Sequence, residues 1–250
     1  MARKICVVIT ARASYSRIRS LLIAINNNKN LRLQTVVTAS AVLNRYGSIL
    51  EEIRDDDISI TATLHNVLEG ETLLTSAKTT GLGVIELSSL FNNLKPDIVI
   101  TIADRYETMS TAISASYMNI PLAHIQGGEV TGNIDEKVRH SITKLSDYHF
   151  VSSDNAYERV KKLGENPKFI FNTGCPSIDL AEQIKENKPL DYSPFEKYKG
   201  VGNTFSFKKG YWVVMQHPLT TEIAKTRNDF DSIFSAVKKT NDPVFWFWPN

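Results

Sequence analysis

The feature that most constrains the fold is a stretch in the middle of the chain, residues 97–140, where two short apolar runs flank a helical pattern. The first run, Ile98 to Ile102, is followed by Asp104 and Arg105, and the second, Ile120 to Ile125, by polar and Gly-rich sequence. Short, nearly continuous apolar runs are typical of parallel strands buried on both faces. The stretch therefore predicts a β-α-β unit whose strands deliver polar side chains at their carboxyl ends.

Strand-like and helix-like segments alternate along most of the chain. We expect strands over 5–9, 33–38, 58–64, 98–102, 120–125, 148–152 and 168–172. We expect helices over 15–26, 42–53, 70–94, 107–118, 135–145 and 154–163. This alternation favours a parallel sheet with right-handed crossovers, in an α/β fold of Rossmann-like type.

Several local details follow from residue types. Ser14 or Ser16 is placed to cap the first helix, and Gly81 and Gly83 suggest a break in the third. Tyr117 falls on the apolar side of the helix expected over 107–118. The run of three aspartates at 55–57 is interpreted as a solvated turn.

A change in pattern after residue 173 predicts a second domain. Residues 187–209 are rich in Pro, Gly and Lys and resemble a linker or an insertion, whereas 211–216, 222–239 and 244–248 predict a strand, a helix and a strand. One β-α-β unit is too little for an independent domain. We therefore expect a Rossmann-like first domain over 1–173 and the opening of an incomplete second domain over 174–250.

Composition narrows the possible functions. The 250-residue chain has a net charge of only +2, with its basic residues scattered, which disfavours nucleic acid and membrane surfaces as partners. Cys6 and Cys175 lie far apart, so they form no metal-binding or redox spacing. No apolar segment approaches the ~20 residues of a membrane span. We expect a cytoplasmic protein without a metal site.

The ends of the two central strands carry the candidate chemistry. Asp104 is a candidate general base and Arg105 a candidate partner for a leaving phosphate. The alternative is an internal ion pair at the strand end, which the two adjacent opposite charges after four apolar residues make the less favoured interpretation. His124, Gln126 and Glu129 follow the next strand, where the intervening glycines allow a ligand to approach the backbone closely. By strand alternation, His124 and Gln126 are expected to share a face. A lone His124 is more often a core residue.

Three further segments add candidates. Arg12 and Ser16 lie where the first strand leads into a helix, a position that attracts anions, but without the glycines of a dinucleotide fingerprint. Asp135 begins a helix and either faces the same cleft or pairs with Arg139 four residues on. His217 follows the strand at 211–216 and suits proton transfer near neutral pH.

Together these residues resemble the hydrolysing UDP-N-acetylglucosamine 2-epimerase family. The matching segments are Leu94-Lys-Pro-Asp-Ile98, Ala103-Asp-Arg-Tyr-Glu107, the long run from His124 to Leu145, Gly174-Cys-Pro-Ser177 and Gln216-His-Pro218. The resemblance implies two Rossmann-like domains of the GT-B type with a nucleotide sugar between them. It implies elimination of UDP from UDP-GlcNAc, without a cofactor, and hydration to N-acetylmannosamine, a reaction of sialic acid biosynthesis.

The resemblance also implies residue roles. Asp104, Asp135 and His217 match the acid and base residues of the family. Residues near the nucleotide sugar are matched by Arg12, Ser16, Arg105 and Asn250.

Two departures from the family pattern bear on function. The family often has a catalytic glutamate where this chain has Gln126, and an amide cannot take up a proton, so Glu129 or Asp135 is expected to do so. The other interpretation is a subgroup in which the roles are distributed differently. Some bacterial relatives with this departure act on UDP-GlcNAc or on a diacetamido sugar such as UDP-N,N'-diacetylbacillosamine, which is the alternative substrate. The nucleotide-binding loops of the family's second domain are absent from these 250 residues, so the chain by itself is expected to bind nucleotide poorly and to lack activity.

Two other interpretations remain open at the level of sequence: a glycosyltransferase of the same architecture and a non-catalytic sugar-nucleotide binder. The resemblance further implies a homo-oligomer, either a dimer or a tetramer.

Overall fold

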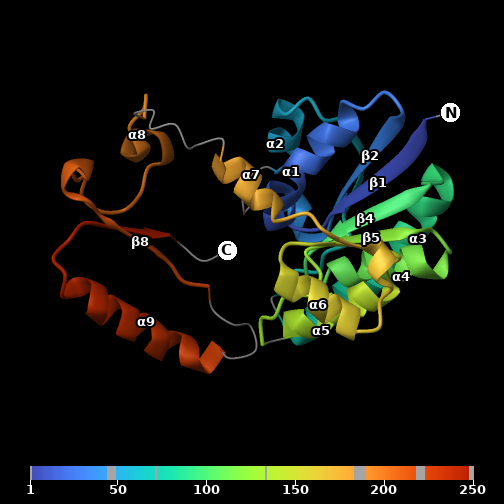
Figure 1. Ribbon diagram of the computed structural model, residues 1–250. Helices are drawn as coiled ribbons and strands as arrows, with labels where there is room; N and C mark the ends of the chain where they lie inside the picture. Colours follow the sequence, from blue (N-terminus) through green and yellow to red (C-terminus); the bar gives the residue numbers. More distant parts are fainter. Residues whose placement is uncertain are drawn as a thin grey trace. The chain divides into compact units, whose positions relative to one another are not determined.

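The computed structural model of the protein describes residues 2–43, 49–70, 72–132, 134–182, 190–217 and 223–247. The chain forms two compact units, residues 1–185 and 186–250, which are described separately (Figure 1). The division falls after the short helix α7 (Pro176–Glu182), because this helix lies against α1 (Arg12–Asn26) of the first unit. The domain boundary expected at residue 173 stays a prediction.

The first unit is built on a seven-stranded sheet in which every adjacent pair of strands is parallel. The strands are β1 (Arg3–Ile9), β2 (Leu31–Thr38), β3 (Ile60–Leu64), β4 (Ile98–Ile102), β5 (Leu122–Ile125), β6 (Tyr148–Val151) and β7 (Ile170–Asn172). Their order in space is β3-β2-β1-β4-β5-β6-β7. The parallel α/β fold expected from the sequence is confirmed.

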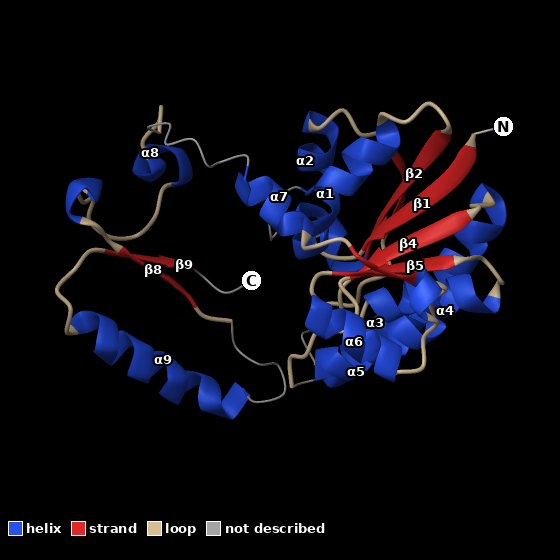
Figure 2. Cartoon of the chain, viewed as in Figure 1, coloured by secondary structure: helices blue, strands red, loops and turns tan. Residues whose placement is uncertain are grey.

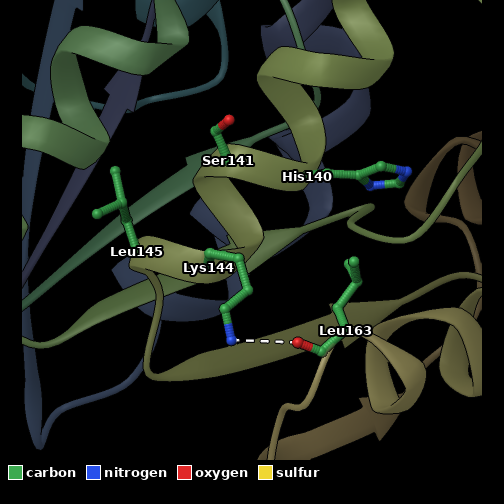
Figure 3. A pocket seen from close by; sticks show the side chains of 5 residues that line it. All are labelled: His140, Ser141, Lys144, Leu145 and Leu163. Carbon is green, nitrogen blue, oxygen red and sulfur yellow. Dashed lines mark hydrogen bonds between the residues drawn. The ribbon is translucent and has the colours of Figure 1, made fainter.

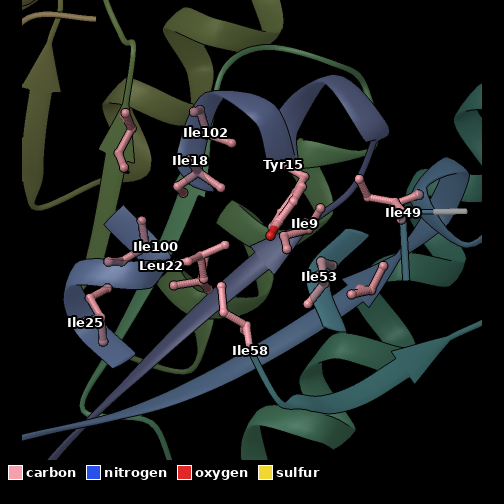
Figure 4. Close-up of a cluster of buried hydrophobic side chains, with 14 of the residues drawn as sticks. Ile9, Tyr15, Ile18, Leu22, Ile25, Ile49, Ile53, Ile58, Ile100 and Ile102 are labelled. Atoms are coloured by element: carbon pink, nitrogen blue, oxygen red, sulfur yellow. The ribbon is translucent and has the colours of Figure 1, made fainter. Parts of the chain in front are cut away.

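Helices cover both faces of this sheet (Figure 2). Besides α1 and α7, they are α2 (Ile49–Asp55), α3 (Leu73–Leu94), α4 (Thr108–Tyr117), α5 (Ile134–Leu145) and α6 (Asp154–Lys162), with short 3-10 turns η1 (Ala39–Val42) and η3 (Pro167–Phe169). The core under α1 and α2 is rich in isoleucine (Figure 4). On the opposite face, α3, α4 and α5 bury a second cluster against Cys6, Val8 and Val99.

The helix α3 runs without interruption through both of its glycines, so the expected break is wrong. Gly83 is buried, and a Cβ atom added there would lie 2.7 Å from Ser110 Oγ of α4 and 2.8 Å from Asn66 Nδ2. The glycine therefore permits close helix packing rather than a bend. On α4, the buried positions include the small residues Ala112 and Ala115, which suit this close packing. Tyr117, expected on the apolar side of this helix, is instead 86% exposed.

Two other local expectations are corrected. The first helix begins at Arg12, so Ser14 and Ser16 lie inside it, and its N-cap Ala11 makes no side-chain hydrogen bond. Asp56 is not a solvated residue, because its carboxylate accepts hydrogen bonds from Tyr15 and Arg19 and ties the end of α2 to α1. Of the helix expected over 42–53, Val42 belongs to η1 and the part from Ile49 belongs to α2, while residues 44–48 lie outside the described residues.

The second unit contains the parallel strands β8 (Trp212–Met215) and β9 (Val244–Phe247), connected by α9 (Ile223–Lys238). The segment before β8, expected to be a linker or an insertion, contains α8 (Pro194–Tyr198) and the 3-10 turn η4 (Phe207–Lys209). Aromatic rings from this segment pack together and onto β9: Phe195, Phe205, Phe207, Tyr211 and Phe245. No helix in the described part of either unit has the length and apolar character of a membrane span.

The close approach of α3 to α4 gives a test of the packing. We expect G83A to lower the free energy of unfolding by roughly 1–3 kcal/mol through overpacking, although Ala favours helices more than Gly does. N93A, at an exposed position of the same helix, is the control and should leave stability unchanged or slightly raised. Urea denaturation measures both; equal stability of G83A and the parent protein would contradict the packing.

Candidate active site at the carboxyl ends of the central strands

The polar strand ends meet where the order of the sheet reverses. The chain proceeds from β1 outward to β2 and β3, then returns to place β4 on the other side of β1. In open α/β sheets, ligands bind at the carboxyl ends of the strands flanking such a reversal. Here Thr10 after β1 and Thr108 after β4 approach each other, with their Oγ1 atoms 3.1 Å apart.

Glu107 stabilises the loops that follow the carboxyl ends of the central strands. Its side chain is buried and accepts hydrogen bonds from Arg105 Nε at 3.1 Å and from the Ser40 hydroxyl at 2.9 Å. Burial alone lowers the pKa of Arg105, but the carboxylates of Glu107 and Asp135 act in the opposite direction, and the net shift is upward. Arg105 therefore remains a cation beside Asp135, and its side chain is 48% exposed.

Asp104 does not pair with its neighbour in sequence. Its carboxylate forms an ion pair with Arg139 of α5, and both side chains are largely buried, at 13% and 5% exposure. Arg139 also donates to the Glu129 carbonyl oxygen at 2.8 Å. Burial, together with the nearby positive charges of Arg17 and Arg159, lowers the pKa of Arg139 to about 10, so the guanidinium is still charged at neutral pH.

His124 of β5 is completely buried. Its Nε2 atom is 2.9 Å from the Ala103 carbonyl oxygen, and its Nδ1 atom is 3.1 Å from Thr143 Oγ1 of α5. Since a carbonyl only accepts, Nε2 carries the proton and Nδ1 accepts from Thr143. Ala103 has a left-handed backbone (φ 65°), which is costly for a residue with a Cβ atom. His124 thus fixes the bend that leads into Asp104, and its expected contact with substrate stays a prediction.

The residues after β5 turn away from the strand pattern. Gln126 has a left-handed backbone (φ 62°), so strand alternation ends before it, and its Nε2 atom donates to Cys175 Sγ at 3.2 Å. His124 and Gln126 therefore contact different partners. Other parts of the protein occupy the space beside the two glycines that follow. A Cβ atom on Gly127 would lie 2.9 Å from Thr143 Oγ1, and one on Gly128 would lie 2.5 Å from the Ala156 carbonyl oxygen. They serve packing against α5 and α6, not the approach of a ligand.

The beginning of α1 offers further groups that suit an anion. The N-cap Ala11 leaves the first-turn N–H groups without a side-chain partner, and such groups favour negative charge. Arg12 is half exposed and lies 3.5 Å from Glu52 of α2. The Ser16 hydroxyl donates to the Ala13 carbonyl oxygen at 3.2 Å.

Guanidinium groups from three helices gather around the segment after β5. Arg139 of α5 and Arg159 of α6 donate to the carbonyls of Glu129 and Gly128, respectively. Arg17 of α1 is close enough to lower the pKa of Arg139. Like charges held this closely raise the local positive potential, which favours an anionic ligand.

Two further predicted residues lie in the second unit or outside the described residues. His217 is exposed and follows the carboxyl end of β8 in the second unit. Asn250 lies outside the described residues. The site roles predicted for these two residues, for Glu129 and Asp135, and for the others above stay predictions.

A shallow cavity of about 450 Å³ lies elsewhere, on the outer side of α5 (Figure 3). There Lys144 Nζ donates to the Leu163 carbonyl oxygen at 3.2 Å. His140, Ser141 and Leu145 complete its lining. It includes none of the predicted site residues, so we assign it no catalytic role.

Two residues that hold the candidate site together, Arg139 and Glu107, are not singled out by the sequence. The sequence offers a surface pair with Asp135 as one of two interpretations for Arg139, and it marks Glu107 only as the start of a helix. A usable signal exists for Glu107, because a carboxylate two residues after Arg105 can reach it directly. No local pattern pairs Arg139 with Asp104, because that contact depends on how α5 packs.

The buried histidine predicts a pH dependence of stability. Burial lowers the pKa of His124 to about 4 from 6.5. Below pH 6.5 this histidine binds a proton in the unfolded chain but stays neutral in the folded protein. The free energy of unfolding should therefore fall between pH 6.5 and 4, by up to about 3 kcal/mol. Urea denaturation across this range should show a smaller decrease for H124Q, with the exposed-histidine variant H65Q as the control. His149, whose pKa is also lowered by burial, is present in both proteins and does not affect the comparison. An unchanged decrease in H124Q would therefore contradict this assignment.

Comparison with known proteins places the chain in a family. A family model described as UDP-N-acetylglucosamine 2-epimerase matches residues 23–250. A Legionella pneumophila protein named UDP-N,N'-diacetylbacillosamine 2-epimerase (hydrolyzing) is 32% identical over 250 residues, which are 100% of this chain and 64% of that protein. A Campylobacter jejuni protein named GDP/UDP-N,N'-diacetylbacillosamine 2-epimerase (hydrolyzing) is 34% identical over 232 residues. The match covers 92% of this chain and 58% of the Campylobacter protein. The chain therefore spans less than two thirds of these relatives.

A solved structure agrees with the fold. The UDP-GlcNAc 2-epimerase of Neisseria meningitidis, in a crystal structure bound to UDP-GlcNAc, has a TM-score of 0.79 at 18% identity, covering 98% of this chain and 66% of that one. At this identity the likeness concerns the fold alone. The family model, in contrast, covers most of the chain and confirms the resemblance seen in its motifs. The chain belongs to the UDP-N-acetylglucosamine 2-epimerase family.

Proposed function

We propose that the protein containing this chain is a hydrolysing 2-epimerase that converts a UDP-2-acetamido sugar and water into UDP and the free sugar inverted at C2. The observation that carries the proposal is the Asp104–Arg139 ion pair at the carboxyl end of β4, beside the exposed cation Arg105. A carboxylate next to an anion-binding group is what removal of a proton and departure of a diphosphate require.

In the first step, Asp104 removes the proton from C2 of the sugar while the bond between C1 and the diphosphate oxygen breaks. The electron pair of the C2–H bond becomes the C1–C2 double bond of a 2-acetamidoglucal, and UDP leaves with the electrons of the C1–O bond. The buried guanidinium of Arg139 favours the ionised form of Asp104, which is the form that accepts the proton. Arg105 and the positive charges of Arg17 and Arg159 favour the negative charge on the departing diphosphate.

In the second step, water adds syn across the double bond: its oxygen bonds to C1 and its spare proton passes to solvent, while a side chain delivers a proton to C2. Both groups add on the face opposite to the one from which Asp104 removed the first proton, so C2 is inverted.

The proton delivered to C2 needs a donor other than Gln126, because an amide has none to give at neutral pH. Asp135, in the first turn of α5, is the first candidate in its protonated form, since its carboxyl group interacts with Arg105. Glu129 is the second, and His217 is the acid or base that the second domain supplies.

Two substrates fit this chemistry. The names of the Legionella and Campylobacter relatives favour UDP-N,N'-diacetylbacillosamine, while the Neisseria structure holds UDP-GlcNAc in the same fold. Both sugars carry the 2-acetamido group and the anomeric diphosphate on which the reaction depends. We propose UDP-N,N'-diacetylbacillosamine as the first substrate to test and UDP-GlcNAc, with N-acetylmannosamine as its product, as the second.

Turnover in D2O tests the reaction directly. The intact gene product is incubated with each UDP-sugar, and NMR follows free UDP and the released sugar. We expect UDP release without any acceptor and one solvent deuterium at C2 of the inverted product, because the C2 proton exchanges with solvent. UDP release only when an acceptor sugar is present would indicate a glycosyltransferase, and binding without turnover would indicate a non-catalytic binder; either result contradicts the proposal.

The proposed base can be removed with little change in shape. D104N should reduce kcat by at least about 100-fold, since an amide cannot take up the C2 proton. E158Q neutralises an exposed carboxylate on α6 and is the matched control, with unchanged kcat expected. Thermal melts followed by circular dichroism show whether D104N remains folded, and turnover within a few fold of the parent enzyme would exclude Asp104 as the base.

The role of Arg139 predicts a change in pH profile. Without its charge the ionised form of Asp104 is less favoured, so R139M should move the acid limb of kcat/KM upward by at least about one pH unit, and R139K should move it less. R159M removes a guanidinium that holds the Gly128 carbonyl but not Asp104, and it serves as the control. A purely structural role for Arg139 would lower kcat/KM at every pH without moving the limb.

A further inference from the structure

The side chain of Gln126 is held at its nitrogen and free at its oxygen. Its Nε2 atom donates a hydrogen bond to Cys175 Sγ at 3.2 Å, which connects the end of β5 to the segment between β7 and α7. Among the described residues no hydrogen bond reaches its Oε1 atom, and this atom is not buried. The amide oxygen can therefore accept a hydrogen bond from water or from a ligand.

Gln126 follows the strand next to the one that carries Asp104. The last residue of β5, Ile125, accepts a hydrogen bond at its carbonyl oxygen from Ala103 N, at 3.0 Å. Ala103 directly precedes Asp104, and neighbouring strands are about 4.8 Å apart. A sugar carbon placed against Asp104 therefore has its own substituent close to the Gln126 amide.

The backbone of Gln126 also indicates a functional role. Its left-handed conformation (φ 62°) would cost a glycine nothing but is unfavourable for a residue with a Cβ atom. Residues held in such conformations cluster at functional sites. The side chain of Gln126 is thus kept at a position where the backbone alone would favour glycine.

Backbone hydrogen bonds fix the chain on both sides of Cys175. Before it, Thr173 N donates to the Val151 carbonyl oxygen of β6 at 3.0 Å. After it, Ile178 N in the first turn of α7 donates to the Cys175 carbonyl oxygen at 2.9 Å. A sulfur atom is a weak acceptor, but one on a fixed backbone can still hold the Gln126 amide in one orientation.

An amide held in this way matches an acetamido group. With one N–H bonded to sulfur, the side chain of Gln126 still offers one N–H donor and one carbonyl acceptor. An acetamido group presents one N–H and one carbonyl oxygen, so the two amides can form two hydrogen bonds. A carboxylate at this position would accept from the acetamido N–H but would have no donor for its carbonyl oxygen.

We propose that Gln126 binds the 2-acetamido group of the substrate and that Cys175 is the positioning residue that orients its amide. The proposal rests on the proposed function for the position of C2 beside Asp104. It gives Gln126 a role in recognition of the substrate, in place of the proton transfer that an amide cannot perform.

Isothermal titration calorimetry with the intact gene product tests the role of Gln126. UDP-GlcNAc and UDP-glucose differ only at C2, which carries an acetamido group in the first and a hydroxyl group in the second. In a D104N background, which limits turnover, we expect tighter binding of UDP-GlcNAc. Q126L should reduce the ratio of the two dissociation constants by about tenfold, because two hydrogen bonds are lost. D179N, at an exposed position of α7, is the control and should leave the ratio unchanged.

A double-mutant cycle tests the role of Cys175. C175A leaves the Gln126 amide without its partner and should reduce the same ratio by about threefold. C175S should reduce it less, since a hydroxyl group can still accept the hydrogen bond. In the Q126L background C175A should have no further effect, because Cys175 acts only through Gln126. A merely structural role would instead weaken the binding of both nucleotide sugars alike, in either background.

Three results would overturn the proposal: equal affinity of the D104N protein for the two nucleotide sugars, an unchanged ratio in Q126L, or an undiminished effect of C175A in the Q126L background. Circular dichroism melts check that each variant is folded. Failure of the proposed reaction gives a different result. A protein that prefers UDP-GlcNAc through Gln126 but releases no UDP would contradict the epimerase and still support the acetamido site.

Discussion

The candidate site depends on one buried ion pair, between Asp104 at the end of β4 and Arg139 on α5. A guanidinium this far from water is stable as a cation only with charged or hydrogen-bonding partners close by. The partners of Arg139 are the Asp104 carboxylate and the Glu129 carbonyl oxygen. The pair therefore links the loop after β4 and the segment after β5 to α5. It also holds a carboxylate at the carboxyl end of β4.

Other contacts hold this pair in place. His124 joins the bend at Ala103 to Thr143 of α5. On the side of β1, the buried Glu107 carboxylate joins the loops after β2 and β4 through Ser40 and Arg105. A preorganised carboxylate surrounded by cations is well suited to elimination, in which a proton and a diphosphate leave the same substrate.

The sequence alone predicts the parallel sheet, the central β-α-β unit and the edge of the sheet where Asp104 and Arg105 lie, because short apolar runs and the residues that end them are local signals. It does not predict contacts that only packing creates. Gly83 appeared to break a helix and instead lets α3 approach α4. Gly127 and Gly128 appeared to face a ligand and instead fit beneath α5 and α6. Arg139 appeared to be a surface residue, because nothing within one helix shows that its side chain reaches a strand end 35 positions earlier.

The central claim is that the reacting carbon of a UDP-2-acetamido sugar sits against Asp104 at the carboxyl end of β4. A crystal structure of the intact gene product with an unreactive analogue of the UDP-sugar measures this directly. The account predicts C2 of the sugar within about 3.5 Å of an Asp104 carboxylate oxygen, with Arg105 on the side of the diphosphate. A sugar bound away from β4, with Asp104 still closed onto Arg139 and no substrate atom near it, would contradict the account.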